Sequence, residues 1–274
     1  MAKAYGRWLI SQAYYDNSPI VRYGRDIAVG EFLSFSEYWL WRNGLDAEEI
    51  ALIDACYSVC SKPSAALDVG ANIGFFSLAL SKAGFDSVIA FEPVPLTFQR
   101  LRRNLARNPT VSERIIALNF GLGDFRGPVQ FEESRQSPGQ NRIAIATSPT
   151  RRDTSFCTCK IERLDEALTN LGIREIGFLK LDVEGFEPAV VQGGKNSLST
   201  GLVRFVYSEI IPKALQEAGY TVDQFEKLLR DTGFYPVILN TPSYDNFERV
   251  SFDLALRTAG EKRNILFQHA RFFP

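Results

Sequence analysis

Short apolar runs alternate along the chain with segments whose apolar residues recur at helical spacing. The apolar runs lie at residues 64–69, 87–91, 115–120, 176–181, 203–210, 235–239 and 264–269, and the helical segments include 75–83, 96–106, 164–171 and 223–230. This alternation is typical of a parallel sheet whose strands are joined by crossover helices. We therefore expect an α/β fold in which the last two strands form an antiparallel pair.

Two segments depart from this alternation. Residues 1–62 are rich in aromatic side chains and include a capping-box-like helix start, with Asp46 followed by Glu49. We interpret them as an N-terminal cap of irregular chain and one or two helices, packed against a main domain over residues 63–274. Residues 127–160 are interpreted as a β-rich insertion at the sheet edge. Its expected strands cover 129–132, 142–147 and 156–161.

Composition narrows the class of protein. The chain has 274 residues, of which 45% are hydrophobic, enough for one large domain with a well-formed core. Its 31 basic and 32 acidic residues give a net charge of −1, so it lacks the basic character of a nucleic-acid-binding protein. No run approaches the roughly 18 apolar residues of a membrane span, and no signal-peptide core follows Lys3 and Arg7, so we expect cytoplasmic residence.

The cysteines and the histidine give little support for a metal site. Cys56 is near Cys60, Cys157 is near Cys159, and His269 is distant from both pairs in sequence. In a reducing compartment such cysteines are more often buried free thiols than zinc ligands. We expect no metal, and the sequence gives no signal for an oligomeric state.

A turn bracketed by glycines joins the first apolar run to the first helical segment. Its chemistry-bearing residues are Asp68, Gly70, Asn72 and Gly74. A glycine turn that leads into a helix lets backbone N–H groups approach a ligand closely. A dinucleotide fingerprint would need glycine where the chain has Asn72 and Phe75, which disfavours a nicotinamide cofactor. The turn fits either an S-adenosylmethionine site or a tight turn without a ligand.

An acidic residue follows each of the next two apolar runs. Glu92 comes directly after the run at 87–91 and 22 residues after Gly70, close to the offset of about 20 at which an acid binds ribose hydroxyls. Asp124 follows the third run by a Gly-Leu-Gly turn, where it would contact an adenine amine or only hold the turn. Because ligands bind at the carboxyl ends of strands in open α/β sheets, we expect both acids at the site.

The run at 176–181 leads into a second charged motif. Lys180, Asp182, Glu184 and Glu187 lie within eight residues of one another. Side chains alternate along a strand, so Lys180 and Asp182 share one face. Crowded buried acids need partners because an unpaired buried charge is costly. Such a partner could be Lys180, or the ammonium group of a bound ligand, or a metal ion. A structural lysine–aspartate pair beside a helix cap is the alternative without a ligand.

Taken together, these motifs make the chain resemble the FkbM-type family of S-adenosylmethionine-dependent methyltransferases. The matching stretches are LDVGANIGFFSLAL (67–80), FEPVP (91–95), GLGD (121–124), LDEAL (164–168) and FLKLDVEGFEPAVVQGG (178–194), in the order of that family. Segments 1–62 and 241–274 carry no match. The resemblance implies a Rossmann-like, seven-stranded class I methyltransferase sheet with S-adenosylmethionine as cofactor. It also implies methyl transfer to a hydroxyl oxygen of a sugar, a glycolipid or a secondary-metabolite acceptor.

The resemblance also assigns residues to the site. Asp68, Gly70, Asn72 and Gly74 would hold the methionine portion, Glu92 the ribose, Asp124 the adenine, and Asp182 would lie near the sulfonium. Methyl transfer is an in-line displacement that depends mainly on positioning and is helped by a base for the hydroxyl proton. No histidine lies near a motif, so we predict Asp182 or Glu184 as this base, with Lys180 orienting it.

Other functions are weighed against this one. A non-catalytic, S-adenosylmethionine-binding or scaffolding protein with the same fold is one alternative, and the intact acidic motif argues against it. An NAD-dependent oxidoreductase is another, which the glycine spacing disfavours. Nucleic-acid methylation is disfavoured by the net charge of −1 and by the lack of an N-P-P-[YF] motif. We therefore expect a small-molecule or glycan acceptor.

Overall fold

The computed structural model describes residues 20–21, 27–29, 47–134, 141–144, 154–239, 247–259 and 264–273. Most of the predicted cap over residues 1–62 lies outside these ranges, as do residues 145–147 of a predicted strand. The division into a cap and a main domain stays a prediction. In the described ranges no helix combines the length and the apolar character needed to cross a membrane. Cytoplasmic residence stays a prediction.

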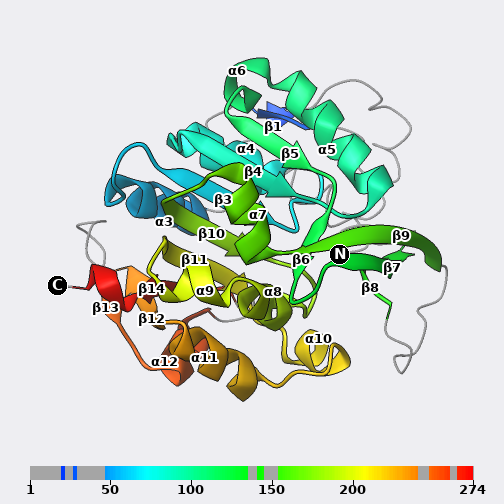
Figure 1. The fold of residues 1–274 in the computed structure, drawn as a ribbon. Helices are drawn as coiled ribbons and strands as arrows, with labels where there is room; N and C mark the ends of the chain where they lie inside the picture. Colours follow the sequence, from blue (N-terminus) through cyan, green and yellow to red (C-terminus); the bar gives the residue numbers. More distant parts are fainter. Residues whose placement is uncertain are drawn as a thin grey trace, which may run out of the picture.

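A large twisted sheet forms the centre of the molecule (Figure 1). Its eight strands, in spatial order, are β13 (Phe247–Arg249), β12 (Phe234–Leu239), β14 (Asn264–His269), β11 (Val203–Glu209), β10 (Ile176–Leu181), β3 (Ala65–Val69), β4 (Ser87–Phe91) and β5 (Ile115–Leu118). Strands β5, β4, β3, β10 and β11 pair in parallel, whereas β14 is antiparallel to both of its neighbours. The predicted α/β fold and the antiparallel final pair are confirmed, and the short edge strand β13 adds an eighth strand to the seven expected.

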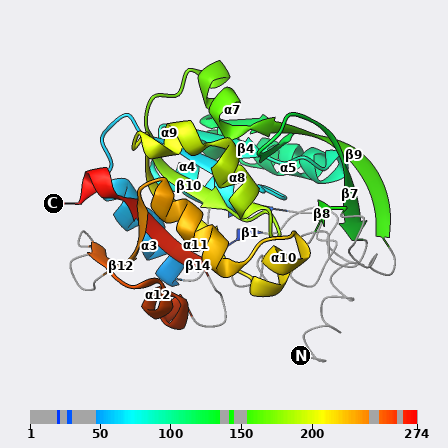
Figure 2. The same cartoon turned by 60° about the horizontal axis from the view of Figure 1, so that its bottom comes forward.

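Helices cover both faces of this sheet (Figures 1 and 2). One face carries α3 (Ala47–Ser58), α4 (Phe75–Ala83), α5 (Pro95–Arg107) and α6 (Pro109–Ser112), and the other carries α7 (Leu164–Leu171), α8 (Glu187–Gly193), α9 (Lys195–Ser199), α10 (Pro212–Glu217), α11 (Val222–Asp231) and α12 (Phe252–Ala259). Successive side chains of β10 point to opposite faces of the sheet. Phe178 packs in the hydrophobic cluster of α3 and α4, and Leu179 packs in the cluster of α8 and α11. Every residue of β10 is buried, so this strand is central.

A second sheet lies beside the first (Figure 1). Its strands, in order, are β6 (Gly121–Gly123), β9 (Thr154–Arg163), β7 (Gly127–Ser134) and β8 (Arg142–Ile143). Three of them lie where the β-rich insertion was predicted. The two-stranded sheet of β1 (Ile20–Val21) and β2 (Ile27–Ala28) contacts the main domain through Asn108, whose side chain hydrogen-bonds the backbone of Ala28.

The strand predicted over 115–120 is confirmed as β5, although it is two residues shorter, whereas the turn predicted from Gly121 was wrong because Gly121–Gly123 form a strand. Strand β5 ends at Leu118, where the side-chain amide of Asn119 donates to the carbonyls of Glu92 and Pro93. The next residues form β6, which pairs with β9 in the second sheet. Glycine permits this because a Cβ at Gly121 would lie 2.8 Å from the side chain of Ile161.

Candidate active site

The turn after β3 depends on its two glycines. Gly70 and Gly74 both have left-handed backbone angles, with φ of 82° and 88°. A Cβ on Gly70 would lie 1.9 Å from the carbonyl oxygen of Asp182, because the ends of β3 and β10 are adjacent here. The N–H groups of Gly70 and Ala71 donate to the carbonyl of Phe91 at 3.1 and 2.9 Å. The turn is thereby fixed against the ends of both neighbouring strands.

Glu92 and Asn72 meet beside this turn. The Glu92 carboxylate accepts hydrogen bonds from the backbone N–H of Asn72 and of Val94, both at 2.9 Å. Glu92 is only 6% exposed, and this burial raises its pKa to about 7 against the opposing effect of the two hydrogen bonds. Asn72 has a left-handed φ of 49°, and its side-chain oxygen is buried and makes no hydrogen bond within the described part of the chain.

Lys180 lies between two aspartates. Its Nζ is 3.4 Å from Oδ1 of Asp68 and 3.1 Å from Oδ2 of Asp182. The other carboxylate oxygen of Asp68 accepts from the hydroxyl of Ser77 at 2.5 Å. Burial acts to lower the pKa of Lys180, but the charges of Asp182 and Asp68 outweigh it and raise this pKa. The lysine therefore stays an ammonium group at neutral pH, and it shares a face with Asp182 as the strand period predicted.

The loop from 182 to 186 is shaped by Glu187 at the start of α8. The Glu187 carboxylate accepts the N–H groups of Val183 at 2.9 Å and of Gly185 at 3.3 Å. Glu187 is 2% exposed, and burial raises its pKa to about 7. Glu184 has a left-handed φ of 57°. Glu187 therefore holds the loop that presents Asp182 and Glu184.

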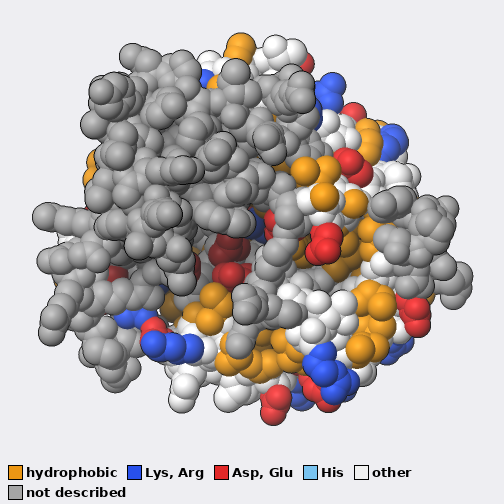
Figure 3. All heavy atoms as spheres, turned by 180° about the vertical axis from the view of Figure 1, so that it is seen from behind, with side chains coloured by type: hydrophobic (Ala, Val, Ile, Leu, Met, Phe, Trp, Pro, Cys, Tyr) orange, Lys and Arg blue, Asp and Glu red, His pale blue; other side chains and the backbone are white. Residues whose placement is uncertain are grey.

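Two cavities meet at this loop. The turn cavity, of about 60 Å³, is lined by residues that include Gly70, Asn72, Glu92, Asp182 and Glu184. The acidic cavity, of about 210 Å³, is lined by residues that include Glu49, Gly70, Asn72, Lys180, Asp182, Tyr207, Glu209 and Asn264. Asp182 lines both, so it marks the junction of the two spaces. On the side of the molecule opposite to Figure 1, acidic side chains are visible near the middle of the surface (Figure 3).

Some residues of the acidic cavity were not predicted from the sequence. Glu209 ends β11 at the same sheet edge as Asp182, and burial, followed by the charges of Asp182 and Glu184, raises its pKa to about 8. Tyr207 donates its hydroxyl to the Glu49 carboxylate at 3.1 Å, and burial raises the pKa of both groups. The position of Glu209 at a strand end was a usable signal.

Asp124 follows β6 and is not among the lining residues of either cavity, and its assignment to the adenine stays a prediction. Its backbone oxygen accepts from the guanidinium of Arg163 at 2.5 Å, and its charge adds to burial in raising the pKa of Tyr220. Asp68 and Gly74 also line neither cavity: Asp68 is buried and pairs with Lys180, and a Cβ on Gly74 would meet Leu101 at 2.4 Å.

A family model for the methyltransferase FkbM domain matches residues 68–236, which is more than half of the chain. The chain belongs to the FkbM methyltransferase family. It is similar to the hexuronic acid methyltransferase AglP of Haloferax volcanii, with 33% identity over 176 residues that cover 61% of this chain and 67% of that protein. It is also similar to the 31-O-demethyl-FK506 methyltransferase FkbM of Streptomyces tacrolimicus, with 27% identity over 220 residues that cover 70% of this chain and 80% of that protein.

Among solved structures, the methyltransferase FkbM from Methylobacillus flagellatus KT aligns with 79% of this chain at 15% identity and a TM-score of 0.47, and this chain spans about half (48%) of its length. The resemblance drawn from the sequence motifs is confirmed by the family match, and the chain is an S-adenosylmethionine-dependent methyltransferase of this family. This family match supports a methyltransferase and not the NAD-dependent oxidoreductase that was the alternative.

The residues present suit S-adenosylmethionine. This cofactor carries an ammonium group and ribose hydroxyls, which need hydrogen-bond acceptors. The buried side-chain oxygen of Asn72 and the Glu92 carboxylate are acceptors on the wall of the turn cavity. Gly70 and Gly74 keep side chains out of the turn. In the described ranges no group of three or more potential metal ligands occurs, and independence from metal stays a prediction.

Proposed function

We propose that the protein transfers the methyl group of S-adenosylmethionine to a hydroxyl oxygen of a sugar or secondary-metabolite acceptor. The observation that carries this proposal is the position of Asp182, which lies where the turn cavity meets the acidic cavity. The relatives named for a hexuronic acid and for 31-O-demethyl-FK506 support a sugar or secondary-metabolite acceptor, and the 31-O position in the second name supports transfer to oxygen. The net charge of −1 keeps nucleic acids outside the proposal.

In this proposal the turn cavity, of about 60 Å³, holds the ribose of the cofactor, and the other portions of the cofactor extend beyond it. When bound there, S-adenosylmethionine supplies a methyl group on a positively charged sulfur, and the sulfur keeps the bonding electron pair as a neutral thioether. Asn72 and the turn from Gly70 to Gly74 bind the methionine portion, and Glu92 accepts from the ribose hydroxyls. The adenine contact assigned to Asp124 stays a prediction, since this residue lines neither cavity.

Asp182 takes the proton of the acceptor hydroxyl while the oxygen of that hydroxyl forms its bond to the methyl carbon. The Asp182 side chain is 39% exposed, so an acceptor can reach it, and Lys180 holds one of its oxygens at 3.1 Å. Lys180 is itself fixed by the buried Asp68, which makes the position of Asp182 rigid. Glu184 lines the turn cavity but not the acidic cavity, and this favours Asp182 as the base.

The test uses S-adenosylmethionine with a labelled methyl group and a panel of hydroxylated acceptors that includes hexuronic acid glycosides and hydroxylated macrolides. For Asp182→Asn we expect label transfer to fall by about 10²- to 10⁴-fold, the usual contribution of a general base. Cofactor affinity, measured by calorimetry, should change only a few-fold. The matched control, Glu184→Gln, should keep most of the transfer. Equal losses of transfer and affinity in Asp182→Asn would assign this residue to cofactor binding instead.

A further inference from the structure

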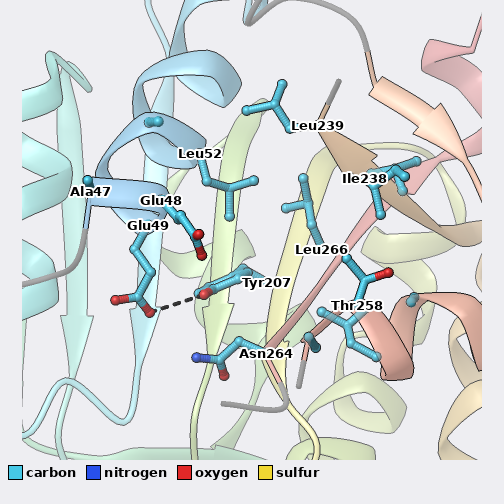
Figure 4. A pocket seen from close by; sticks show the side chains of 15 residues that line it. Ala47, Glu48, Glu49, Leu52, Tyr207, Ile238, Leu239, Thr258, Asn264 and Leu266 are labelled. Carbon is cyan, nitrogen blue, oxygen red and sulfur yellow. Dashed lines mark hydrogen bonds between the residues drawn. The ribbon is translucent and has the colours of Figure 1, made fainter. Parts of the chain in front are cut away.

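A third and larger cavity, of about 470 Å³, adjoins the acidic cavity (Figure 4). Its walls are formed by α3 on one side and by β12, β14 and α12 on the other. We call it the apolar cavity. Its volume is within the range of about 300–1,000 Å³ that small-molecule sites occupy.

The cavity exists because two neighbouring strands separate. The register of β12 and β14 ends where Val237 lies opposite Leu266. Beyond this pair, Ile238 and Leu239 continue into the pairing of β12 with β13. The first residues of β14, from Asn264, pair instead with β11. The space between the diverging strands opens at the carboxyl edge of the sheet, which is the edge that carries the candidate active site.

The lining divides into an apolar body and a polar end. Most side chains of the lining are apolar, and they include Ala51, Leu52, Ile238, Leu239 and Leu266. Figure 4 shows Leu52 facing Leu239 and Leu266 across the space, with Glu49, Tyr207 and Asn264 gathered at one end and the carboxylate of Glu48 between Leu52 and Tyr207. The hydroxyl of Tyr207 donates to Glu49 at 3.1 Å, which fixes this polar end.

The same three polar residues also line the acidic cavity, together with Asp182 and Lys180. The apolar cavity therefore borders the acidic cavity at these three residues, beside the proposed methyl-transfer site. A molecule that spans both cavities needs an apolar portion in one and a hydroxyl group in the other. A free sugar lacks the apolar portion and would leave the apolar walls without a matching surface.

We propose that the apolar cavity binds the carbon skeleton of the methyl acceptor, and that this acceptor is a hydroxyl-bearing molecule with apolar rings or an apolar chain. This inference rests on the proposed function and refines its acceptor class. Glu49 and Asn264 position the hydroxyl-bearing end of the skeleton, and the side chains around Leu52 and Leu266 enclose the remainder. Burial of apolar surface supplies the affinity for the acceptor, and the polar end of the cavity sets the orientation of the acceptor.

The test uses 2-naphthol, an apolar double ring with one hydroxyl, titrated against the protein and followed by its fluorescence. We expect saturable binding to the wild type. Ala51→Phe fills the cavity from α3, and Thr258→Phe fills it from the exposed face of α12 on the opposite wall. Each should weaken 2-naphthol binding by about tenfold or more, because an added ring occupies the same space. Ala106→Phe, on α5 and lining none of the three cavities, is the matched control and should leave binding unchanged.

Calorimetric titration with S-adenosylmethionine separates this inference from the proposed function. All three variants should bind the cofactor as the wild type does, which also shows that each is folded. Absence of saturable 2-naphthol binding, binding that survives both cavity-filling substitutions, or saturable binding of glucose in its place would each overturn the inference while cofactor binding persists. Failure of the wild type to bind S-adenosylmethionine would count against the proposed function itself.

Discussion

Lys180 on β10 lies directly beside Asp68 on β3 in the parallel register, and its Nζ is 3.4 Å from Oδ1 of that aspartate. Asp68 has no exposed surface, and its second oxygen is occupied by Ser77. The lysine also holds Asp182 at the sheet edge. One ammonium group thus neutralises a buried carboxylate in the core and positions a second one that faces the cavities.

Replacement of this lysine should destabilise the fold. In Lys180→Met the Asp68 carboxylate would stay buried without its partner, and we expect a loss of about 3–5 kcal/mol in the free energy of unfolding. Lys227→Met, which breaks an exposed ion pair with Asp231 on α11, should change the free energy of unfolding far less, because water and salt screen an exposed pair. Urea unfolding of both variants measures the difference. Equal, small losses would show that Asp68 does not depend on Lys180.

Gly70→Ala should cost more than the strain of its backbone angle. At Gly172, which also has a left-handed φ of 66°, a Cβ would meet nothing within 4 Å, so Gly172→Ala should cost only about 1–2 kcal/mol. At Gly70 the Cβ would also meet the Asp182 carbonyl at 1.9 Å and would displace the loop that carries this residue. We expect a larger loss of stability and a loss of S-adenosylmethionine binding in Gly70→Ala alone. Similar behaviour of the two variants would contradict the close approach.

Cofactor affinity should depend on pH through Glu92. Burial raises the pKa of this carboxyl to about 7, and it must be ionised to accept from two ribose hydroxyls. We therefore expect affinity for S-adenosylmethionine to rise about tenfold from pH 6 to pH 8, as one proton is lost. Calorimetry across this range should show the rise in the wild type and none in Glu92→Gln. A rise that persists in the variant would assign the titration to another group.

Stability should fall with rising pH because of Glu209. Its pKa in the folded chain is about 8, raised by burial and by neighbouring acids from an ordinary value of 4.5. Between these two values the folded chain keeps a proton that the unfolded chain releases, so the free energy of unfolding decreases as pH rises from about 4.5 to about 8. Glu209→Gln should make this decrease smaller, with Glu92 and Glu187 contributing the remainder, and Glu166→Gln, at a 43% exposed side chain, should leave it unchanged. Thermal unfolding at a series of pH values measures both, and a slope unchanged in Glu209→Gln would refute the assignment.

The sheet and most helices could be predicted from the sequence because the buried strands of a parallel sheet are short, nearly continuous apolar runs, separated here by segments with helical spacing. The glycine turn and the charged motif after β10 were also predictable, since each lies within about eight residues of a strand end. Gly121–Gly123 were predicted as a turn because two glycines are typical of turns, and no local pattern shows that this segment pairs with a strand of the second sheet. Gly121–Gly123 pair with β9, which follows thirty residues later in the chain.

The polar end of the apolar cavity could not be predicted for a different reason. Glu49, Tyr207 and Asn264 come from three distant segments and meet because β14 lies beside β11 and α3 packs over the same edge. No local pattern marks such a meeting. Asn264 is an ordinary polar residue at a strand start, and Glu49 resembles any first-turn acid of a helix.

Calorimetric titration of the purified protein with S-adenosylmethionine, with NAD as the control, tests the central claim most directly. The account predicts binding of S-adenosylmethionine in the micromolar range and no binding of NAD, with the affinity strongly reduced in Glu92→Ala while the melting temperature stays close to that of the wild type. Binding of NAD, or an affinity for S-adenosylmethionine that Glu92→Ala leaves unchanged, would contradict the assignment of the turn cavity as the cofactor site.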